Sequence, residues 1–274
     1  MLRHGLILAS SLLVAQATWA QAPAQAAGAG APAPESPAKQ MARARLMEMA
    51  HFLASAEKFS FTLRSGHDAL QANGQKIEFG GSRQVAVQRP NLVRIENAGS
   101  DGHRELMLFD GRNITLFDAA SAVYSQRQQP GDIDATVVHF VRDLKMKMPL
   151  APLLMKAFPV ELERRTLSID YVEHTDILGQ HAHHVAGRTA TVDFQVWIAD
   201  GPRPLPLRIV LGYKTEPGHP QFWAQFSDWN LAPEYASGVF DFSAPQGASR
   251  IPFAVEALSL APQPKPASTQ GGKK

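Results

Sequence analysis

Hydrophobic residues in the first quarter of the chain recur at helical spacing. Leu46, Met49, Ala50 and Leu53 fall on one stripe with a period of 3.6 residues. A serine-proline pair precedes them, and it favours a helix start because serine accepts an unpaired backbone N–H and proline is tolerated in the first turn. The pattern therefore predicts one amphipathic helix that begins at Ser36 and runs for about five turns.

After this helix the period changes to two. Apolar and polar residues alternate in successive stretches, which is typical of strands with one buried face. Asn73-Gly74 and Asp110-Gly111 are turn pairs between such stretches, and Gly80-Gly81 inside one of them indicates a bulge or a sharp bend. The pattern predicts six strands in an antiparallel meander, at about residues 59–63, 77–87, 93–95, 106–109, 114–117 and 123–124.

Helical spacing returns in the middle of the chain. Four apolar residues between 137 and 144 share one stripe, with Asp132 or Asp134 as the candidate N-cap. Residues 143–159, DLKMKMPLAPLLMKAFP, are rich in Met and Leu and contain three prolines. Methionine fills irregular apolar spaces because its side chain is flexible and polarizable. Two interpretations fit this segment: a lid over an open sheet that contacts an apolar ligand, or a plug that only completes the core.

A second array of strands follows the helical insertion. Alternation predicts strands at about residues 167–171, 181–188, 192–198, 205–211 and 222–226, and then a short apolar stretch at 239–242. About 11 twisted strands tend to curl, and a curled sheet with an apolar concave face needs a cover. We therefore predict an α+β fold in which a large curved antiparallel sheet is covered by the N-terminal helix and the central helical lid.

The ends of the chain have a different composition. Residues 1–20 combine a basic start, an apolar run too short to span a bilayer and small residues suited to cleavage, so they predict a secretory signal peptide. Residues 21–35 are mostly Ala, Pro, Gln and Gly and predict a flexible linker. We expect a single domain over residues 36–260, a disordered tail over 261–274, a periplasmic localisation and no membrane span.

Charge and motifs narrow the function classes. The chain has 27 basic and 25 acidic residues with scattered Lys and Arg, which argues against nucleic-acid binding. It contains no cysteine, which excludes disulfides and thiolate metal sites. No nucleophile elbow or phosphate-binding loop is present. The sequence thus favours a binding protein over an enzyme, with no catalytic residues and no cofactor.

The most distinctive polar cluster is the stretch HAHHV. His181 and His183 are two residues apart and share one face of a predicted strand, while His184 lies on the other. Two imidazoles on one face can bind a metal ion, and His174 upstream could supply a third ligand. Histidines near a turn are more commonly solvated or hydrogen-bonded, so the sequence favours no metal site. A third interpretation is that His183 or His184 forms a hydrogen bond with the head group of a ligand inside a cavity.

Five stretches of the sequence are distinctive: RPNLVRIE at residues 89–96, FDGRNITLFD at 109–118, residues 183–211, and FSDWNLAP and FDFSAPQGASRI near the C-terminus. In these stretches the chain resembles a family of uncharacterised, predicted periplasmic proteins related to the LolA/LolB lipoprotein-carrier superfamily. The resemblance implies an unclosed β-barrel with a helical lid around a hydrophobic cavity. It supplies no site residues that align residue by residue.

These observations lead to one principal hypothesis. We expect a soluble periplasmic carrier whose ligand, an acyl chain or a lipoprotein lipid, lies between the curved sheet and the lid. A periplasmic sensor or scaffold module that binds an envelope partner protein is the alternative, and a metal-dependent enzyme is a third. The predicted cavity and lid residues are Leu144, Met146, Met148, Leu153, Leu154, Met155, Phe158, Phe194, Val196, Phe222 and Phe226.

Overall fold

The computed structural model describes residues 35–144 and 146–253. The expected signal peptide, nearly all of the expected linker and the expected C-terminal tail lie outside the described residues. Described residues from Ser36 onward belong to one compact unit. Within it, apolar side chains from the helices and from both strand arrays form one hydrophobic core.

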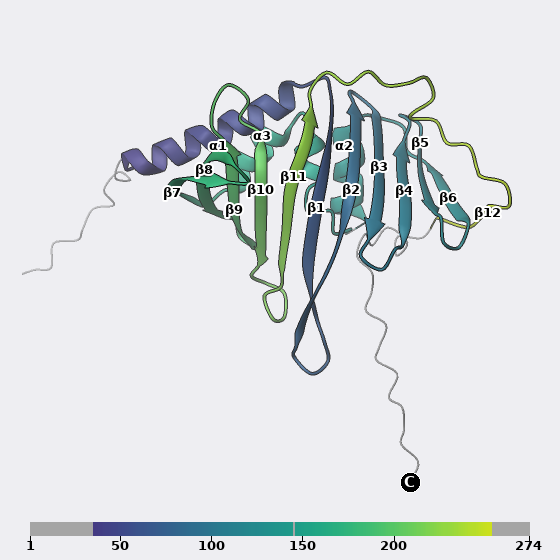
Figure 1. Ribbon diagram of the computed structural model, residues 1–274, viewed down its shortest axis with the longest axis horizontal. Helices are drawn as coiled ribbons and strands as arrows, with labels where there is room; N and C mark the ends of the chain where they lie inside the picture. Colours follow the sequence, from purple (N-terminus) through teal and green to yellow (C-terminus); the bar gives the residue numbers. More distant parts are fainter. Residues whose placement is uncertain (1–34, 145, 254–274) are drawn as a thin grey trace, which may run out of the picture. The chain divides into compact units, whose positions relative to one another are not determined.

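A 12-stranded sheet dominates the structure (Figure 1). Its order is β12-β6-β5-β4-β3-β2-β1-β11-β10-β9-β8-β7, so the end strands β12 and β7 do not pair and the sheet stays unclosed. The first array comprises β1 (Lys58–Leu70), β2 (Lys76–Gln88), β3 (Leu92–Gly99), β4 (Arg104–Phe109), β5 (Asn113–Asp118) and β6 (Val123–Gln128). The second comprises β7 (Ser168–Ile177), β8 (Gln180–Arg188), β9 (Val192–Ala199), β10 (Pro206–Tyr213) and β11 (Gln221–Asn230).

Antiparallel pairing of β1 with β11 joins the two arrays. Both strands bury alternate residues, Phe59, Phe61 and Leu63 on β1 and Phe222, Ala224 and Phe226 on β11. Because the side-chain period of a strand is two, this alternation places all six on one face of the sheet. The same face is apolar across the junction, which is why the core is continuous.

Helix α1 (Pro37–Ser55) begins as its sequence predicts. The Ser36 hydroxyl accepts a hydrogen bond from the Lys39 N–H at 3.4 Å, and Pro37 occupies the first turn. The buried residues of α1 include Leu46, Met49 and Leu53, and the helix packs against β7, β8 and β9. Figure 1 shows α1 lying across these strands.

Residues 132–165, here called the lid segment, connect the two arrays. They contain α2 (Ile133–Val138), the π-helical turn η1 (His139–Asp143), the 3-10 turn η2 (Ala151–Leu154) and α3 (Phe158–Arg165). Helix α3 and η2 both contact α1. Two covers therefore lie on the core face: one long regular helix and one segment of short, irregular helical pieces.

The predicted fold class, an α+β fold with a large unclosed sheet and a helical cover, is confirmed. Two details differ. The sheet has a twelfth strand, β12 (Ser249–Arg250), and it pairs with β6 in parallel, so the sheet is mixed. Of the bulge or sharp bend indicated at Gly80-Gly81, no bulge occurs, because β1 and β2 keep one register from Lys58 to Leu70. The short apolar stretch at residues 239–242 forms no strand.

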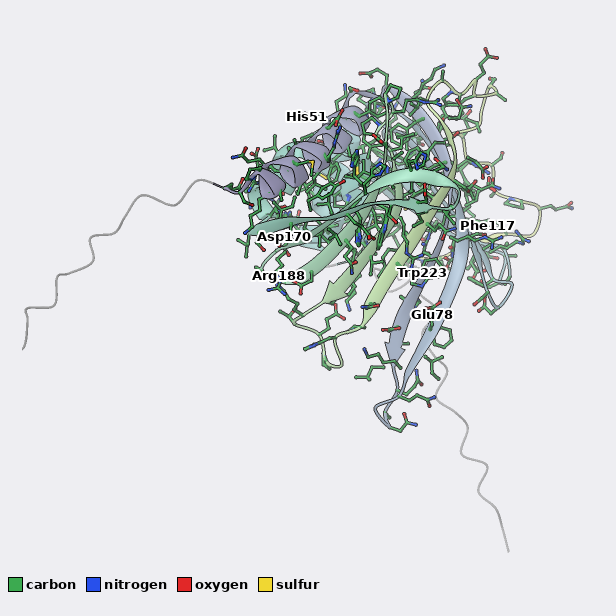
Figure 2. All side chains as sticks on the ribbon, turned by 60° about the vertical axis from the view of Figure 1, so that its left-hand side comes forward. His51, Glu78, Phe117, Asp170, Arg188 and Trp223 are labelled. Carbon is green, nitrogen blue, oxygen red and sulfur yellow. The ribbon has the colours of Figure 1, made fainter. Side chains whose placement is uncertain are left out.

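The opposite face of the sheet carries a row of polar and aromatic side chains. Arg208 of β10 lies over the rings of Trp223 on β11 and Trp197 on β9, 5.2 and 6.0 Å from their centroids. The Trp223 indole passes over Gly66 of β1, where a Cβ would lie 2.6 Å from Nε1, and donates a hydrogen bond to Glu78 of β2. Figure 2 shows Trp223 and Glu78 together, far from α1 and its His51.

Candidate functional site

The lid segment starts from a helix with a well-formed N-cap. The Asp132 carboxylate accepts the Ala135 N–H at 2.8 Å, which caps α2. After Val138 the helix widens into the π-helical turn η1, and residues 146–150 have no regular secondary structure. Pro149 and Pro152 lack an N–H and so limit regular helix formation here. The chain over this part of the core is consequently held by side chains and isolated turns rather than by a long helix.

One carboxylate fixes the middle of the lid segment. Asp134, on the first turn of α2, accepts hydrogen bonds from the backbone N–H groups of Lys156 and Ala157, each at 2.8 Å. These N–H groups lie just before α3, where an acceptor is favourable because helix N-termini expose unpaired donors. The sequence offered Asp132 and Asp134 as alternative N-caps of one helix: Asp132 caps α2, and Asp134 ties α2 to residues 156 and 157 instead.

A buried guanidinium joins the lid segment to α1. Arg89, 6% exposed, donates to the carbonyl of Ala56 at 2.9 Å, of Leu53 at 3.4 Å and of Leu154. Two of these carbonyls end α1 and the third lies in η2, so one side chain satisfies backbone acceptors from both covers. Burial lowers the pKa of Arg89, and the charges of Asp134 and Glu57 oppose that shift.

An apolar cavity of about 30 Å³ lies between the lid segment and the first strand array. Ten of its eleven lining residues are apolar. They come from β3, β4 and β5 on the sheet side and from α2, η1, η2 and the irregular residues on the lid side: Val93, Met107, Phe109, Ile114, Ile133, Val137, Phe140, Met146, Met148 and Leu154. This lining combines rigid branched and aromatic side chains with three flexible methionines.

The eleventh lining residue is Thr136 of α2. It is 8% exposed, and its Oγ1 is buried without a hydrogen-bond partner among the described residues. A buried hydroxyl normally finds an acceptor or a donor, because leaving it unpaired costs free energy. The surface of the cavity is thus entirely apolar, and the unpaired hydroxyl of Thr136 lies buried behind it.

The structure separates the predicted site residues into three groups. Met146, Met148 and Leu154 line the cavity. Leu153, Met155 and Phe158 are buried in the same core, and Leu144 packs against it half-buried. The strand residues Phe194, Val196, Phe222 and Phe226 are buried on β9 and β11, in the other array, and do not line this cavity.

Sequence reasoning missed the sheet side of the cavity. Val93, Met107, Phe109 and Ile114 lie in stretches that alternation identified as strands, but period alone does not say which strands the lid segment covers. The strand register in the structure shows how the sheet side of the cavity is built. Val93 pairs with Phe109, and Phe109 pairs with Ile114, so these three residues are direct cross-strand neighbours. For the lid side of the cavity, the apolar helical stripe that contains Val137 was a sequence signal from which a lining residue could have been predicted.

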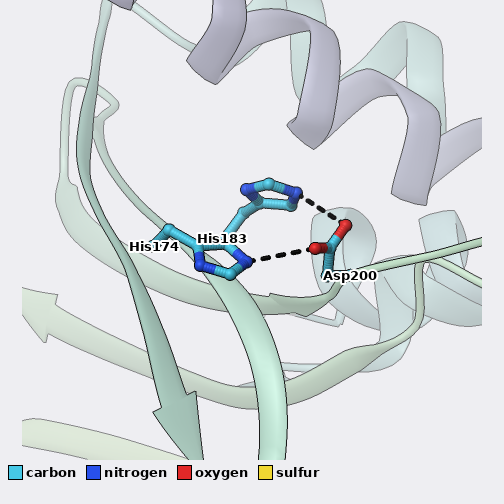
Figure 3. A group of neighbouring side chains, drawn as sticks. All are labelled: His174, His183 and Asp200. Atoms are coloured by element: carbon cyan, nitrogen blue, oxygen red, sulfur yellow. Dashed lines mark hydrogen bonds and ion pairs between the residues drawn. The ribbon is translucent and has the colours of Figure 1, made fainter.

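A second site, which is polar, lies at the β7 end of the sheet (Figure 3). His174 of β7 and His183 of β8 are directly paired across the two strands. Asp200 follows β9, and its carboxylate lies between the two rings, with each Nε2 3.1 Å from one oxygen. Each of the three residues offers one possible metal-ligand atom, and these three atoms lie within 4.8 Å of one another.

The remaining histidines of this region lie outside that group. His181 stacks on His174 with ring centroids 5.9 Å apart and forms an ion pair with Asp176 at 2.5 Å. His184, on the opposite face, stacks on Trp197 at 4.0 Å and contacts Gln195. Neither His183 nor His184 lines the apolar cavity. Sequence reasoning named His181 and His183 as the pair on one face and His174 as a possible third ligand. The structure brings His183 and His174 together with Asp200, which sequence reasoning missed, and leaves His181 outside the close group.

Hydrogen bonding and burial tune the polar site. The hydrogen bond from His174, followed by that from His183, lowers the pKa of Asp200, with burial opposing the shift. Tyr171 lies 2.9 Å from Nδ1 of His183. Burial raises the pKa of its hydroxyl, which therefore stays protonated near neutral pH. Asp200 is accordingly a carboxylate held by two imidazoles.

The fold and cavity define an open half-barrel with a helical lid. A family model described as "Predicted periplasmic protein (DUF2092)" matches residues 42–254, and the chain belongs to this family. The family resemblance and the periplasmic localisation predicted from the sequence are thereby confirmed. No curated protein matches the chain.

Three solved structures illustrate the similarity. The lipoprotein LppX of Mycobacterium tuberculosis is 13% identical, with 71% of this chain and 98% of that chain covered and a TM-score of 0.46. A LolA superfamily protein of Nitrosomonas europaea is 10% identical, with 76% and 99% covered and a TM-score of 0.37. The MucA/MucB complex of Pseudomonas aeruginosa gives 18% identity, 74% and 62% coverage and a TM-score of 0.40.

Each of these TM-scores is below 0.5, and the strand order and the helices of this chain itself define the open half-barrel. None of the helices in the described residues is long and apolar enough to cross a membrane.

Proposed function

We propose that this protein binds a hydrophobic ligand, an acyl chain or a lipoprotein lipid, between the first strand array and the lid segment. The observation that carries the proposal is the cavity itself, whose wall is apolar except for Thr136. Apolar cavities of this kind favour apolar guests because water gains no hydrogen bonds in them. The proposed role is binding and transfer rather than catalysis.

The ligand enters by displacing part of the lid segment. A volume of about 30 Å³ holds roughly two water molecules, which is far less than an acyl chain occupies. The lid side of the wall is the adaptable side, since Met146 and Met148 are flexible and lie in residues without regular secondary structure. The sheet side is fixed by cross-strand pairing. Enlargement of the cavity therefore comes from the lid segment moving away from β3, β4 and β5.

The unpaired hydroxyl gives the ligand a polar contact. Oγ1 of Thr136 lies buried behind the apolar cavity wall, and once the lid segment has moved it can exchange a hydrogen bond with a carboxyl, ester or amide group of the ligand. Such a bond is favourable because the hydroxyl has no partner among the described residues otherwise. A fatty acid is thus expected to bind more tightly than a hydrocarbon of equal length.

Uptake of a fluorescent fatty acid by delipidated protein tests the proposal. Wild-type protein is expected to take up about one probe per chain with saturation. Met148→Glu places a charge in the half-buried lid wall and is expected to weaken uptake at least tenfold, because burying an unpaired carboxylate is costly. Val160→Glu on α3, 67% exposed, is the matched control and keeps wild-type uptake.

Native mass spectrometry of protein isolated from the periplasm complements the titration and is expected to detect a bound acyl species. Absence of both the bound species and saturable uptake by wild-type protein would refute the carrier function. In that case the alternative hypothesis, a module that binds a partner protein, is favoured, because it does not require a ligand in the cavity. Thermal unfolding of both variants controls for loss of folding.

A further inference from the structure

The group of His174, His183 and Asp200 has the composition of a metal site. Two imidazole nitrogens and one carboxylate form a ligand set that suits zinc and neighbouring divalent transition metals. The three residues come from β7, from β8 and from the residue after β9, so the sheet register itself brings them together. We propose that this group binds one divalent transition-metal ion of the zinc type.

The distances agree with this proposal. Ligand atoms that each lie about 2.0–2.2 Å from one tetrahedral ion are roughly 3.3–3.6 Å apart. In the structure each imidazole Nε2 is 3.1 Å from an Asp200 oxygen, and the three ligand atoms lie within 4.8 Å of one another. An ion therefore needs only sub-ångström adjustment of each N–O pair and a modest approach of the two rings.

The backbone around the three ligands is fixed. His174 and His183 are a cross-strand pair, and the Asp200 N–H donates to the His181 carbonyl at 2.9 Å, which anchors the end of β9 to β8. His183 is buried, with a side chain only 10% exposed. A pre-arranged site gains affinity because little side-chain freedom is lost on binding.

Tyr171 supplies the outer contact that metal-bound histidines usually have. Its hydroxyl lies 2.9 Å from Nδ1 of His183, on the side of the ring away from Asp200. When Nε2 of His183 binds the ion, the ring proton lies on Nδ1 and is donated to the Tyr171 oxygen. This contact fixes the tautomer and the orientation of the ring.

The site is accessible and leaves room for solvent ligands. The side chains of His174 and Asp200 are 47% and 42% exposed, so an ion reaches them directly from solvent. Three protein ligands leave at least one coordination position for water. The competing interpretation is a hydrogen-bonded cluster in which Asp200 only pairs with two histidines, and it predicts no stoichiometric metal binding.

Calorimetric titration with Zn²⁺ distinguishes the two interpretations. The full chain is secreted to the periplasm, purified without a polyhistidine tag and stripped with a chelator. Wild-type protein is expected to bind one Zn²⁺ per chain. His174→Ala and Asp200→Asn each remove one ligand and are expected to weaken binding at least tenfold. His181→Ala, which removes the stacked but exposed neighbour, is the matched control and is expected to stay within twofold.

Three outcomes would overturn the proposal: no stoichiometric binding by wild-type protein, wild-type affinity in both ligand variants, or an equal loss in the His181 control. Co²⁺ substitution gives a second readout, since visible absorption reports the ligand geometry and is expected to disappear in His174→Ala. Fatty-acid uptake is expected to be unchanged in all three variants, so failure of the metal site leaves the carrier proposal standing. Thermal unfolding of the metal-free proteins verifies that each variant is folded.

Discussion

The two strand arrays are covered in different ways. Over β7, β8 and β9 lies the 19-residue helix α1, whose buried stripe packs directly on the sheet. Over β3, β4 and β5 lies the lid segment, in which α2, η1 and η2 are each six residues or shorter and leave a cavity. A regular helix satisfies its own backbone hydrogen bonds, whereas short turns depend on side chains such as Asp134 and Arg89.

This difference separates stability from adaptability. Phe194 in the α1-covered array lies over Gly187 of the neighbouring strand, so the ring fills the space of a missing side chain. In the lid-covered array methionines face a cavity instead. Regions with few regular hydrogen bonds open at lower free energy than regular elements. The lid-covered array is therefore the part of the protein suited to admit a ligand, and the α1-covered array is the rigid support.

Replacement of Arg89 is the strongest test of the difference between the two covers. Arg89→Met removes the charged donor that the carbonyls of Leu53, Ala56 and Leu154 share. The free energy of unfolding is expected to fall by about 3 kcal/mol, since hydrogen bonds from charged groups are strong. Urea unfolding measures the loss. Arg142→Met, at a position 72% exposed, is the matched control and costs less than about 0.5 kcal/mol.

Hydrogen exchange on the same variant tests where the structure loosens. If the lid segment depends on side-chain ties, amides of residues 146–157 exchange faster in Arg89→Met while those of β8 and β9 keep their protection. Equal loss of protection in both arrays would contradict the separation of the molecule into an adaptable and a rigid half.

Most of the elements were predictable, because alternation and helical stripes depend on local sequence. Residues 36–57 and the strands of both arrays follow those periods closely. Strand β12 was missed because two residues show no period. The location of the cavity was missed because alternation does not tell which strands the lid segment covers. Asp200 was missed because it follows the end of β9, where the alternation stops, and only the pairing of β7, β8 and β9 brings it beside the two histidines. Packing between elements is a tertiary property.

The rigid half is tested by adding one carbon. Gly187→Ala places a Cβ against the ring of Phe194, which is buried and cannot turn away, so the free energy of unfolding is expected to fall by about 2 kcal/mol. Gly212→Ala is the matched control on β10, because its Cβ meets only the Asp193 carbonyl oxygen at 3.8 Å. Chemical denaturation measures both. Equal effects would show that strand propensity, not the close aromatic contact, decides the cost.

The adaptable half is tested by removing one hydroxyl. Thr136→Val keeps the branched shape and removes the unpaired Oγ1, so the ligand-free protein is expected to gain about 1 kcal/mol of stability. Thr115→Val on β5 is the matched control with the opposite sign, because the Thr115 hydroxyl accepts a hydrogen bond from Gln126 at 3.0 Å. Thermal unfolding of delipidated protein gives both values. Destabilisation by Thr136→Val would mean that its hydroxyl has a partner.

The smallest expected effect concerns α3, the last helix of the lid segment, which contacts α1. Hydrogen bonds from Arg164, opposed by burial, and from Arg165 lower the pKa of Glu161. A carboxyl whose folded pKa lies below its unfolded pKa of about 4.3 stabilises the protein above that pH and loses this contribution as the pH falls through the folded value. Glu161→Gln is therefore expected to cost under about 1 kcal/mol at pH 7, because the pair is partly exposed, and nothing at the most acidic pH.

Urea unfolding of wild type and Glu161→Gln between pH 7 and pH 3 measures this difference, with Glu163→Gln at an exposed position of α3 as the matched control. The two curves are expected to converge on acidification, since protonation removes in the wild type what the substitution removes at every pH. Hydrogen exchange at pH 5 and pH 3.5 then shows whether the amides of α3 lose protection together with the rest of the lid segment or keep it together with α1. If α3 loses protection together with the rest of the lid segment, the boundary between the adaptable and the rigid half lies at the contact of α3 with α1.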